Sequence, residues 1–267
     1  MMPRGLAIHI GLNAVDAAHY QGWDGELDAA EHDARDMRAI ADALGYETTL
    51  LLTRQASGEA VCKAIDAVAH ALAAGDAMLL SFAGYGGRLP NGRRTWALYD
   101  RQLLEDELQE LLARFERGVR VFVLADTCHG APAHGAYQAI HANPALRTFS
   151  PGRDTPRFRD LPADVEQRTH AAHRPLYDAV RNGGAATVSA GLLFMSACQE
   201  NQLAAETDHN GLFTATLLSV WQGGRFKGDY RDLHRAIQHT MPPWQSPALC
   251  EGGARDVRLD DTRPLRV

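Results

Sequence analysis

Short apolar runs alternate along the chain with longer stretches of helical spacing, and this alternation restricts the fold more than any other feature. Residues 77–82 and 119–125 are nearly continuous apolar runs, which is typical of strands that are covered on both faces. Strands that alternate with helices build βαβ units. The sequence therefore predicts an α/β fold in which helices flank a mostly parallel central sheet.

The remaining elements follow the same alternation. Further strands are expected at residues 6–10, 48–52, 192–197 and, as a short last strand, 247–250. Helices are expected at residues 29–44, between Ser57 and Gly75, and at residues 103–115, 211–221 and 230–239. No internal repeat or low-complexity linker divides the chain, so we expect a single domain over residues 1–267, with residues 130–174 as a long exposed loop.

The composition is that of an ordinary soluble protein, with 45% apolar and 22% charged residues. The net charge of −6 gives no electrostatic attraction to nucleic acid or anionic lipid. No stretch approaches the roughly 20 apolar residues of a membrane span, and the first apolar run is too short for a signal peptide, so a cytoplasmic protein is expected. The cysteines form no C-x-x-C pair, which argues against a zinc site and leaves a lone nucleophile open.

Polar sequence follows two of the predicted strands, at the edge where parallel sheets bind ligands. Residues 77–82 lead into Ala83-Gly84-Tyr85-Gly86-Gly87, and residues 119–125 lead into Asp126-Thr127-Cys128-His129-Gly130. A cysteine at this edge can reach a substrate as a nucleophile, although free cysteines are also common as small buried hydrophobic residues. The glycines do not predict a nucleotide-binding loop, because Leu89 stands where the third glycine of G-x-G-x-x-G belongs.

These segments resemble the caspase-family cysteine peptidases, in particular the metacaspase and bacterial caspase-like (orthocaspase) branch. In that branch one strand ends in a Ser-Gly-His-Gly-Gly type motif and another in Asp-Ser-Cys-His-Ser-Gly, which correspond here to residues 83–87 and 126–130. Shorter matching segments keep the family's order along nearly the whole chain: residues 11–13, 19–23, 33–37, 98–102 and 210–214. The resemblance implies the three-layer caspase-hemoglobinase fold.

The resemblance also implies roles for individual residues. Cys128 would attack the scissile carbonyl, and the backbone N–H groups of Cys128 and Gly86 would stabilise the oxyanion. Asp33 and Asp126 match positions that line an acidic pocket for Arg or Lys at P1. By its surroundings alone, Asp33 would more often be a solvated helix residue. The implied activity is that of a cysteine endopeptidase that cleaves peptide bonds after Arg or Lys.

Two site residues depart from the family pattern. Tyr85 stands at the position of the dyad histidine, and Ala83 stands where a pocket serine is usual. A tyrosine cannot be the cation that stabilises a thiolate, and loss of a positioned acid or base costs on the order of 10²–10⁴ in rate. Weakened peptidase activity is therefore expected. Two alternatives stay open: an inactive pseudoprotease that binds peptides or partners through the same pocket, and an unrelated doubly wound small-molecule binder.

Other residues near the predicted site supply candidates of their own. Four histidines of the long loop could fold over the site in place of the dyad base: His134, His141, His170 and His173. His129 is adjacent to Cys128, but successive residues of an extended chain point to opposite faces. Family members often cut themselves after a basic residue in such a loop, and the candidates here are Arg147 and Arg153.

No metal or cofactor is expected. Arg93 and Arg94 stand where the family often has acidic residues that help to bind calcium. Glu105 and Asp106 keep an acidic pair at another calcium-associated position. Acidic residues at the start of a helix are favoured by its dipole without any ion, so this pair does not require calcium. The expected partner is a peptide or protein substrate with Arg or Lys at P1, and the sequence assigns no oligomeric state.

Overall fold

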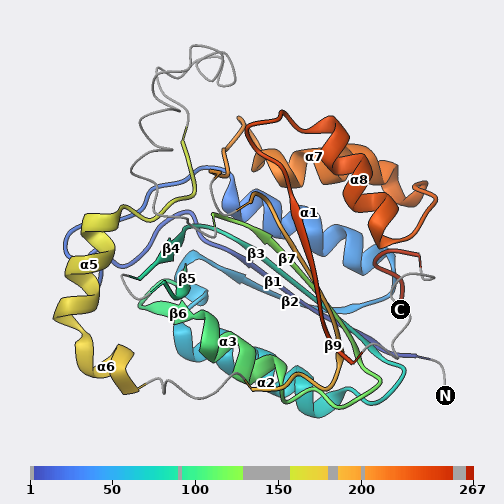
Figure 1. The fold of residues 1–267 in the computed structure, drawn as a ribbon, viewed down its shortest axis with the longest axis horizontal. Helices are drawn as coiled ribbons and strands as arrows, with labels where there is room; N and C mark the ends of the chain where they lie inside the picture. The colour runs from blue at the N-terminus through green and yellow to red at the C-terminus, as the bar shows by residue number, and fades with distance from the viewer. Residues whose placement is uncertain (1–2, 90–91, 129–156, 180–185, 200–201, 255–262) are drawn as a thin grey trace.

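The computed structural model describes residues 3–89, 92–128, 157–179, 186–199, 202–254 and 263–267. Strands form one sheet in the order β2-β1-β3-β7-β8-β9, in which neighbours run parallel except for the antiparallel β9 (Figure 1). Their bounds are β1 Gly5–Gly11, β2 Glu47–Leu52, β3 Ala77–Ala83, β7 Arg120–Asp126, β8 Gly191–Ser196 and β9 Ala248–Gly253. The predicted α/β fold with a mostly parallel sheet is confirmed.

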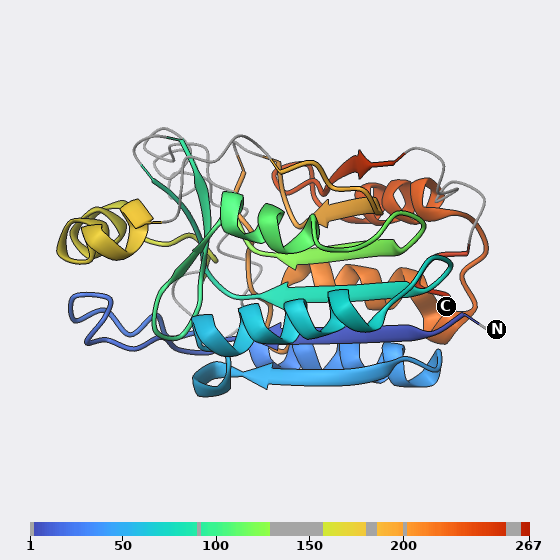
Figure 2. The same cartoon turned by 90° about the horizontal axis from the view of Figure 1, so that it is seen from below.

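Helices cover both faces of this sheet. On one face lie α1 (Ala30–Ala43), α7 (Leu212–Trp221) and α8 (Tyr230–Thr240) (Figure 1). On the other lie α2 (Gly58–Ala71) and α3 (Glu105–Leu112) (Figure 1, Figure 2). Short 3-10 turns follow β2 and α7, at Thr53–Gln55 and Gln222–Gly224. Within the described ranges, none of the helices combines the length and apolarity that crossing a bilayer requires.

The alternation of side chains along each strand creates two separate cores. In β7, Phe122 and Leu124 join the cluster on the side of α1, α7 and α8, whereas Val121 and Val123 join the cluster on the side of α2 and α3. Successive side chains of a strand point to opposite faces, so a strand that is buried on both sides is apolar throughout. This is the physical origin of the continuous apolar run from which the strand was predicted.

A second, smaller sheet lies at the carboxyl end of the parallel strands (Figure 2). Its antiparallel strands are β4 (Gly86–Arg88), β5 (Arg94–Ala97) and β6 (Gln102–Leu104). Trp96 of β5 stacks on Phe82 of β3, with 4.4 Å between the ring centroids, and this contact joins the two sheets. The sequence did not predict these strands, because three or four residues are too few to show a period.

Part of the segment expected to be an exposed loop has a different structure. Residues 130–156 lie outside the described residues, whereas residues 157–162 form a stretch in which Arg159 and Leu161 are buried, and helix α5 (Ala163–Ala172) follows. Helix α6 (Arg174–Ala179) comes next. Glu166 of α5 is buried and accepts hydrogen bonds from three residues of the small sheet: Arg88, Thr95 and Gln102. Polar groups make up much of the buried face of α5, so hydrophobic periodicity gave no signal for it.

Candidate active site at the carboxyl end of the sheet

Cys128 lies at the edge where β3 and β7 end together. The two strands pair in parallel with Ala83 opposite Asp126, and Cys128 follows two residues later. The side chain of Cys128 has no exposed surface, so the expectation of a thiol open to a substrate differs from the structure. The Ala204 N–H donates to Cys128 Sγ at 3.0 Å, and Phe158 packs against the same apolar cluster.

The carboxylates of Asp33 and Asp126 lie close together, and the guanidinium of Arg159 lies between them. Arg159 donates to Asp33 at 2.6 Å and lies 3.1 Å from the Asp126 carboxylate. A third carboxylate, that of Glu206, accepts from the same guanidinium at 3.3 Å. The side chain of Arg159 is 0% exposed. The acidic pocket inferred from the resemblance therefore contains a cation that belongs to the chain itself.

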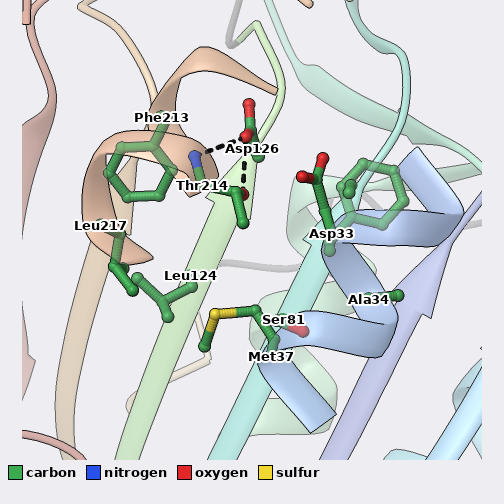
Figure 3. Close-up of a pocket in the computed structure, with 11 residues that line it drawn as sticks. Asp33, Ala34, Met37, Ser81, Leu124, Asp126, Phe213, Thr214 and Leu217 are labelled. Atoms are coloured by element: carbon green, nitrogen blue, oxygen red, sulfur yellow. Dashed lines mark hydrogen bonds between the residues drawn. The ribbon is translucent and has the colours of Figure 1, made fainter. Parts of the chain in front are cut away.

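The segment at the start of α7 fixes the direction of both aspartates. Asp33 is in the first turn of α1 and accepts from the Gly211 N–H and the Asn210 side-chain amide, both at 3.0 Å. Asp126 accepts from the N–H and the hydroxyl of Thr214, at 3.0 Å and 2.7 Å, and Figure 3 shows these two bonds. Charge-assisted bonds of this kind hold a carboxylate in one orientation.

Burial dominates the electrostatics of this cluster. It raises the pKa of Asp33 to about 7, and the neighbouring charge of Asp126 adds to the rise while Arg159 opposes it. Burial also works against the charge of Arg159, but the attraction of Asp126, Asp33 and Glu206 outweighs it and keeps the pKa of the guanidinium above its usual value. Buried acids without a cation are strongly unfavourable, and Arg159 supplies the cation here.

The backbone of Arg159 makes a second set of contacts beside the cysteine. Its carbonyl oxygen accepts from the N–H of Gly86 at 3.0 Å and from the N–H of Cys128 at 3.3 Å. These are the two donors that the resemblance assigns to the oxyanion. A side chain at Gly86 would collide with the Cys128 carbonyl oxygen, so only glycine permits this approach.

The thiol of Cys128 is held in its neutral form. Burial raises its pKa well above the usual value, and a hydrogen bond with Cys198 and the charge of Asp160 act in the same direction. The Ala204 N–H opposes the rise. A thiolate is the reactive species of a cysteine, and the described arrangement disfavours that form of Cys128.

Tyr85, which the resemblance matches to the dyad histidine, makes contacts of another kind. Its ring packs edge-on against Trp23, with 4.7 Å between centroids, and its hydroxyl donates to the Glu26 carbonyl at 3.4 Å. Burial raises the pKa of the phenol further above its usual value. Ala83 is buried and packs with Leu27 beside Tyr85. Tyr85 is therefore a neutral packing residue in this structure rather than a proton acceptor.

The other candidates fall into two groups. His129, His134, His141, Arg147 and Arg153 lie outside the described residues. His173 and His170 lie at α5 and belong to an aromatic group, in which His173 stacks on His19 and His170 stacks on Tyr177. These stacking contacts account for their positions without a role at the thiol.

The residues at the possible calcium position form ion pairs among themselves. Arg93 lies 2.8 Å from Asp106, and Arg94 lies 3.8 Å from Glu105. Both acids are in the first turn of α3. Each of the two acids therefore has an arginine partner in this structure.

Arg159 and Glu206 were not singled out as site residues from the sequence. Arg159 is one of several arginines in a stretch with little apolar periodicity. Glu206 follows an apolar pair and accepts from the N–H groups of Ala29, at 3.1 Å, and Asp28, at 3.3 Å, near the start of α1. The two aspartates could have given a signal, because buried aspartates predict a cation as a partner. No local sequence pattern identifies the arginine that supplies this cation.

Comparisons with known proteins concern the family and the fold. The caspase-domain family of peptidases matches residues 4–255. A protein of Geobacter sulfurreducens with a solved crystal structure is 39% identical, with a TM-score of 0.88, and the match covers 99% of each chain.

Caspase-1 of Spodoptera frugiperda is 14% identical with a TM-score of 0.55, and the match covers 94% of this chain and 87% of the insect enzyme. At this identity the likeness concerns the fold, which is the caspase-like α/β fold expected from the sequence. A search of curated proteins found no match. The family match spans nearly the whole chain, and the chain belongs to the caspase-domain family of cysteine peptidases.

Proposed function

We propose that this protein is a caspase-like cysteine endopeptidase of the metacaspase and orthocaspase type, directed at Arg or Lys and weakened by Tyr85. The observation that carries the proposal is a single residue, Arg159. Its side chain fills a buried acidic pocket while its carbonyl accepts from the N–H groups of Gly86 and Cys128. A peptide with a basic P1 residue would present the same groups in the same places.

The pocket chemistry favours arginine first and lysine second. A planar guanidinium can bond to several carboxylates at once, as Arg159 does with Asp33 and Glu206, whereas an ammonium acts as a compact point charge. An apolar or acidic side chain would leave buried carboxylates without a counter-charge. Specificity in this proposal is therefore mainly electrostatic.

In the proposed reaction all catalytic groups belong to this chain, and water is the co-substrate. The sulfur of Cys128 attacks the carbonyl carbon of the P1 residue, and the N–H groups of Gly86 and Cys128 stabilise the developing oxyanion. The bond to the leaving nitrogen then breaks as a thioester forms, and water hydrolyses the thioester to a carboxylate and restores the thiol. The thiol proton has to reach the amine that leaves. A neutral tyrosine whose pKa is raised by burial accepts that proton poorly, so we expect a rate on the order of 10²–10⁴ below that of a site with a positioned histidine.

A second function is favoured by the state of the cysteine. A neutral thiol and a tyrosine bonded to the Glu26 carbonyl suit a pseudoprotease, which binds basic peptides or partner segments without cutting them. The pocket serves both functions equally well. The two differ only in turnover.

Hydrolysis of fluorogenic peptides with Arg, Lys or Gln at P1 tests the proposal. We expect slow turnover in the order Arg, Lys, Gln, loss of turnover in Cys128→Ala, and a gain of about 10²-fold or more in Tyr85→His. Cys128→Ala preserves the pocket and controls for contaminating peptidases. Turnover that is indifferent to the P1 residue or survives Cys128→Ala would refute the peptidase assignment. Binding of Arg peptides without turnover in any variant would establish the pseudoprotease.

A further inference from the structure

We propose that the chain carries its own inhibitor: residues 157–161 occupy the substrate cleft as a bound peptide, with Arg159 as the P1 residue, and exclude other peptides until they withdraw. This inference rests on the proposed function, because it names the regulation of the same site.

The side chain of Arg159 leaves no room in the pocket for a second cation. It is 0% exposed and contacts three carboxylates. Gly211 closes the pocket from another side, since a side chain there would collide with both Asp126 and Arg159. A basic peptide can enter only when Arg159 leaves.

The backbone of the segment pairs with its surroundings as an added strand does. The Arg159 N–H donates to the Ala204 carbonyl at 2.8 Å, and the Glu206 N–H donates to the Arg157 carbonyl at 3.0 Å. Phe158 and Ala205 form an antiparallel bridge between these bonds. Strand addition is a general mode of peptide binding, in which the main chain gives affinity and alternate side chains give specificity.

The pairing continues beyond Arg159 with Gly86 as the partner. Asp160 forms a parallel bridge with Gly86, and the Leu161 N–H donates to the Gly86 carbonyl at 2.8 Å. The segment is therefore held on both sides of the Arg159–Asp160 peptide bond. The carbonyl of that bond accepts from the Gly86 and Cys128 N–H groups, which are the two donors that the proposed function assigns to the oxyanion.

Three features explain why this bond stays intact. The Cys128 thiol is buried and neutral, Tyr85 directs its hydroxyl at the Glu26 carbonyl, and the carboxyl of Asp160 disfavours a thiolate at Cys128. A bound peptide that is not cleaved blocks a site as an inhibitor does. Its effective concentration is high because it is part of the same chain.

The direct test compares Arg159→Ala with the wild type and with Arg168→Ala, a matched control on the exposed side of α5. The probe is the tripeptide acetyl-Arg-Phe-Arg-amide, which reproduces residues 157–159, and acetyl-Arg-Phe-Gln-amide is its control. We expect binding by calorimetry to be at least about tenfold tighter in Arg159→Ala than in the other two proteins, and only for the arginine peptide. The proposal would be overturned if the arginine peptide bound the wild type as tightly as it binds Arg159→Ala. It would also be overturned if a folded Arg159→Ala did not bind this peptide.

A second test applies where Arg159→Ala does not fold. In Tyr85→His, the sulfur of Cys128 would bond to the Arg159 carbonyl carbon as the bond to the Asp160 nitrogen breaks, and the thiol proton would pass through the imidazole to that nitrogen. Water would then hydrolyse the thioester, which restores the thiol and leaves a carboxylate on Arg159. We expect intact-mass fragments of residues 1–159 and 160–267, which Cys128→Ala in the same background abolishes. An uncut chain, or a cut at another bond, contradicts the proposal.

These tests separate the inhibitor from the enzyme. Peptide binding that appears only in Arg159→Ala, without turnover in any variant, supports the inhibitor and rejects the peptidase. Rapid hydrolysis of external Arg peptides by the intact wild-type chain supports the peptidase and rejects the inhibitor, because the cleft would then be open.

Discussion

Arg159 and Arg4 pair with carboxylates at similar distances, and yet the two regions differ in what the pairing does. Arg4 donates to both carboxylate oxygens of Glu47 at 2.9 Å, with side chains that are 48% and 67% exposed. Arg159 reaches its acids at 2.6–3.3 Å with no exposure. Water can replace either partner at the surface but not in the interior. Burial rather than geometry decides whether an ion pair is required for the fold.

The largest effect is expected from Arg159→Met. This change removes the cation and leaves three buried acids without a counter-charge, which costs about 3–5 kcal/mol in free energy of unfolding. Urea denaturation at pH 8 measures the loss. Because Asp33 takes up a proton more readily when its cation is gone, the loss should be smaller at pH 5. A loss that does not change with pH would show that packing, not charge, is what Arg159 contributes.

A smaller effect is expected from Thr214→Val, which removes the hydroxyl bonded to Asp126. Loss of a hydrogen bond to a buried charged group costs about 1.5–3 kcal/mol. Thr216→Val on the same helix is the matched control, since its hydroxyl donates to the neutral Leu212 carbonyl, and a change of about 0.5–1.5 kcal/mol is expected there. Equal losses in both variants would mean that the charge of Asp126 adds nothing.

The pH dependence of stability should change in Asp160→Asn. Burial raises the pKa of Asp160 to about 7 from an ordinary value of 3.8. The folded state therefore holds a proton that the unfolded state releases between these values, so this carboxyl lowers stability as the pH rises from about 4 through 7. Asparagine carries no such proton. The Tm of Asp160→Asn relative to the wild type should rise from pH 5 to pH 8, and a constant difference would contradict the assigned burial of Asp160.

The smallest effect is expected from Arg4→Met. Exposed pairs of this kind contribute little because water and salt screen them, so the urea midpoint should stay within error of the wild type. Measurement at low and at high salt sharpens the comparison with Arg159→Met. A clear loss in Arg4→Met that disappears in high salt would show that surface charge matters more in this chain than the comparison allows.

The sequence predicted the large sheet well because its signal is collective. Each strand of the central sheet buries alternate residues in two cores, so β3 and β7 appear as continuous apolar runs. The small sheet and α5 were missed. Their strands are short, and α5 buries Glu166 and Thr169 among its few inward residues, so no apolar period marks them.

The residues of the candidate site could be predicted only where a local sequence motif contains them. The segments that contain Gly86, Asp126 and Cys128 were recognised from their order after two strands. Asp33 came from the resemblance alone. Asp33 and Arg159 form an ion pair although they are 126 positions apart in the sequence. A local sequence pattern cannot predict a contact between residues so far apart. The burial of the Cys128 thiol was not predicted for the same reason, because the segment that covers it comes from elsewhere in the chain.

The close approach of Gly86, the first residue of β4, to Cys128 has a consequence for how such proteins are compared. There is no space for even a methyl group next to the Cys128 carbonyl oxygen. Packing alone therefore prevents any other residue at this position, whether or not the protein is active. A relative that has lost all chemistry would still keep glycine there. Retention of this glycine is therefore no sign of a working enzyme, and the identity of the residue before it is the more informative marker.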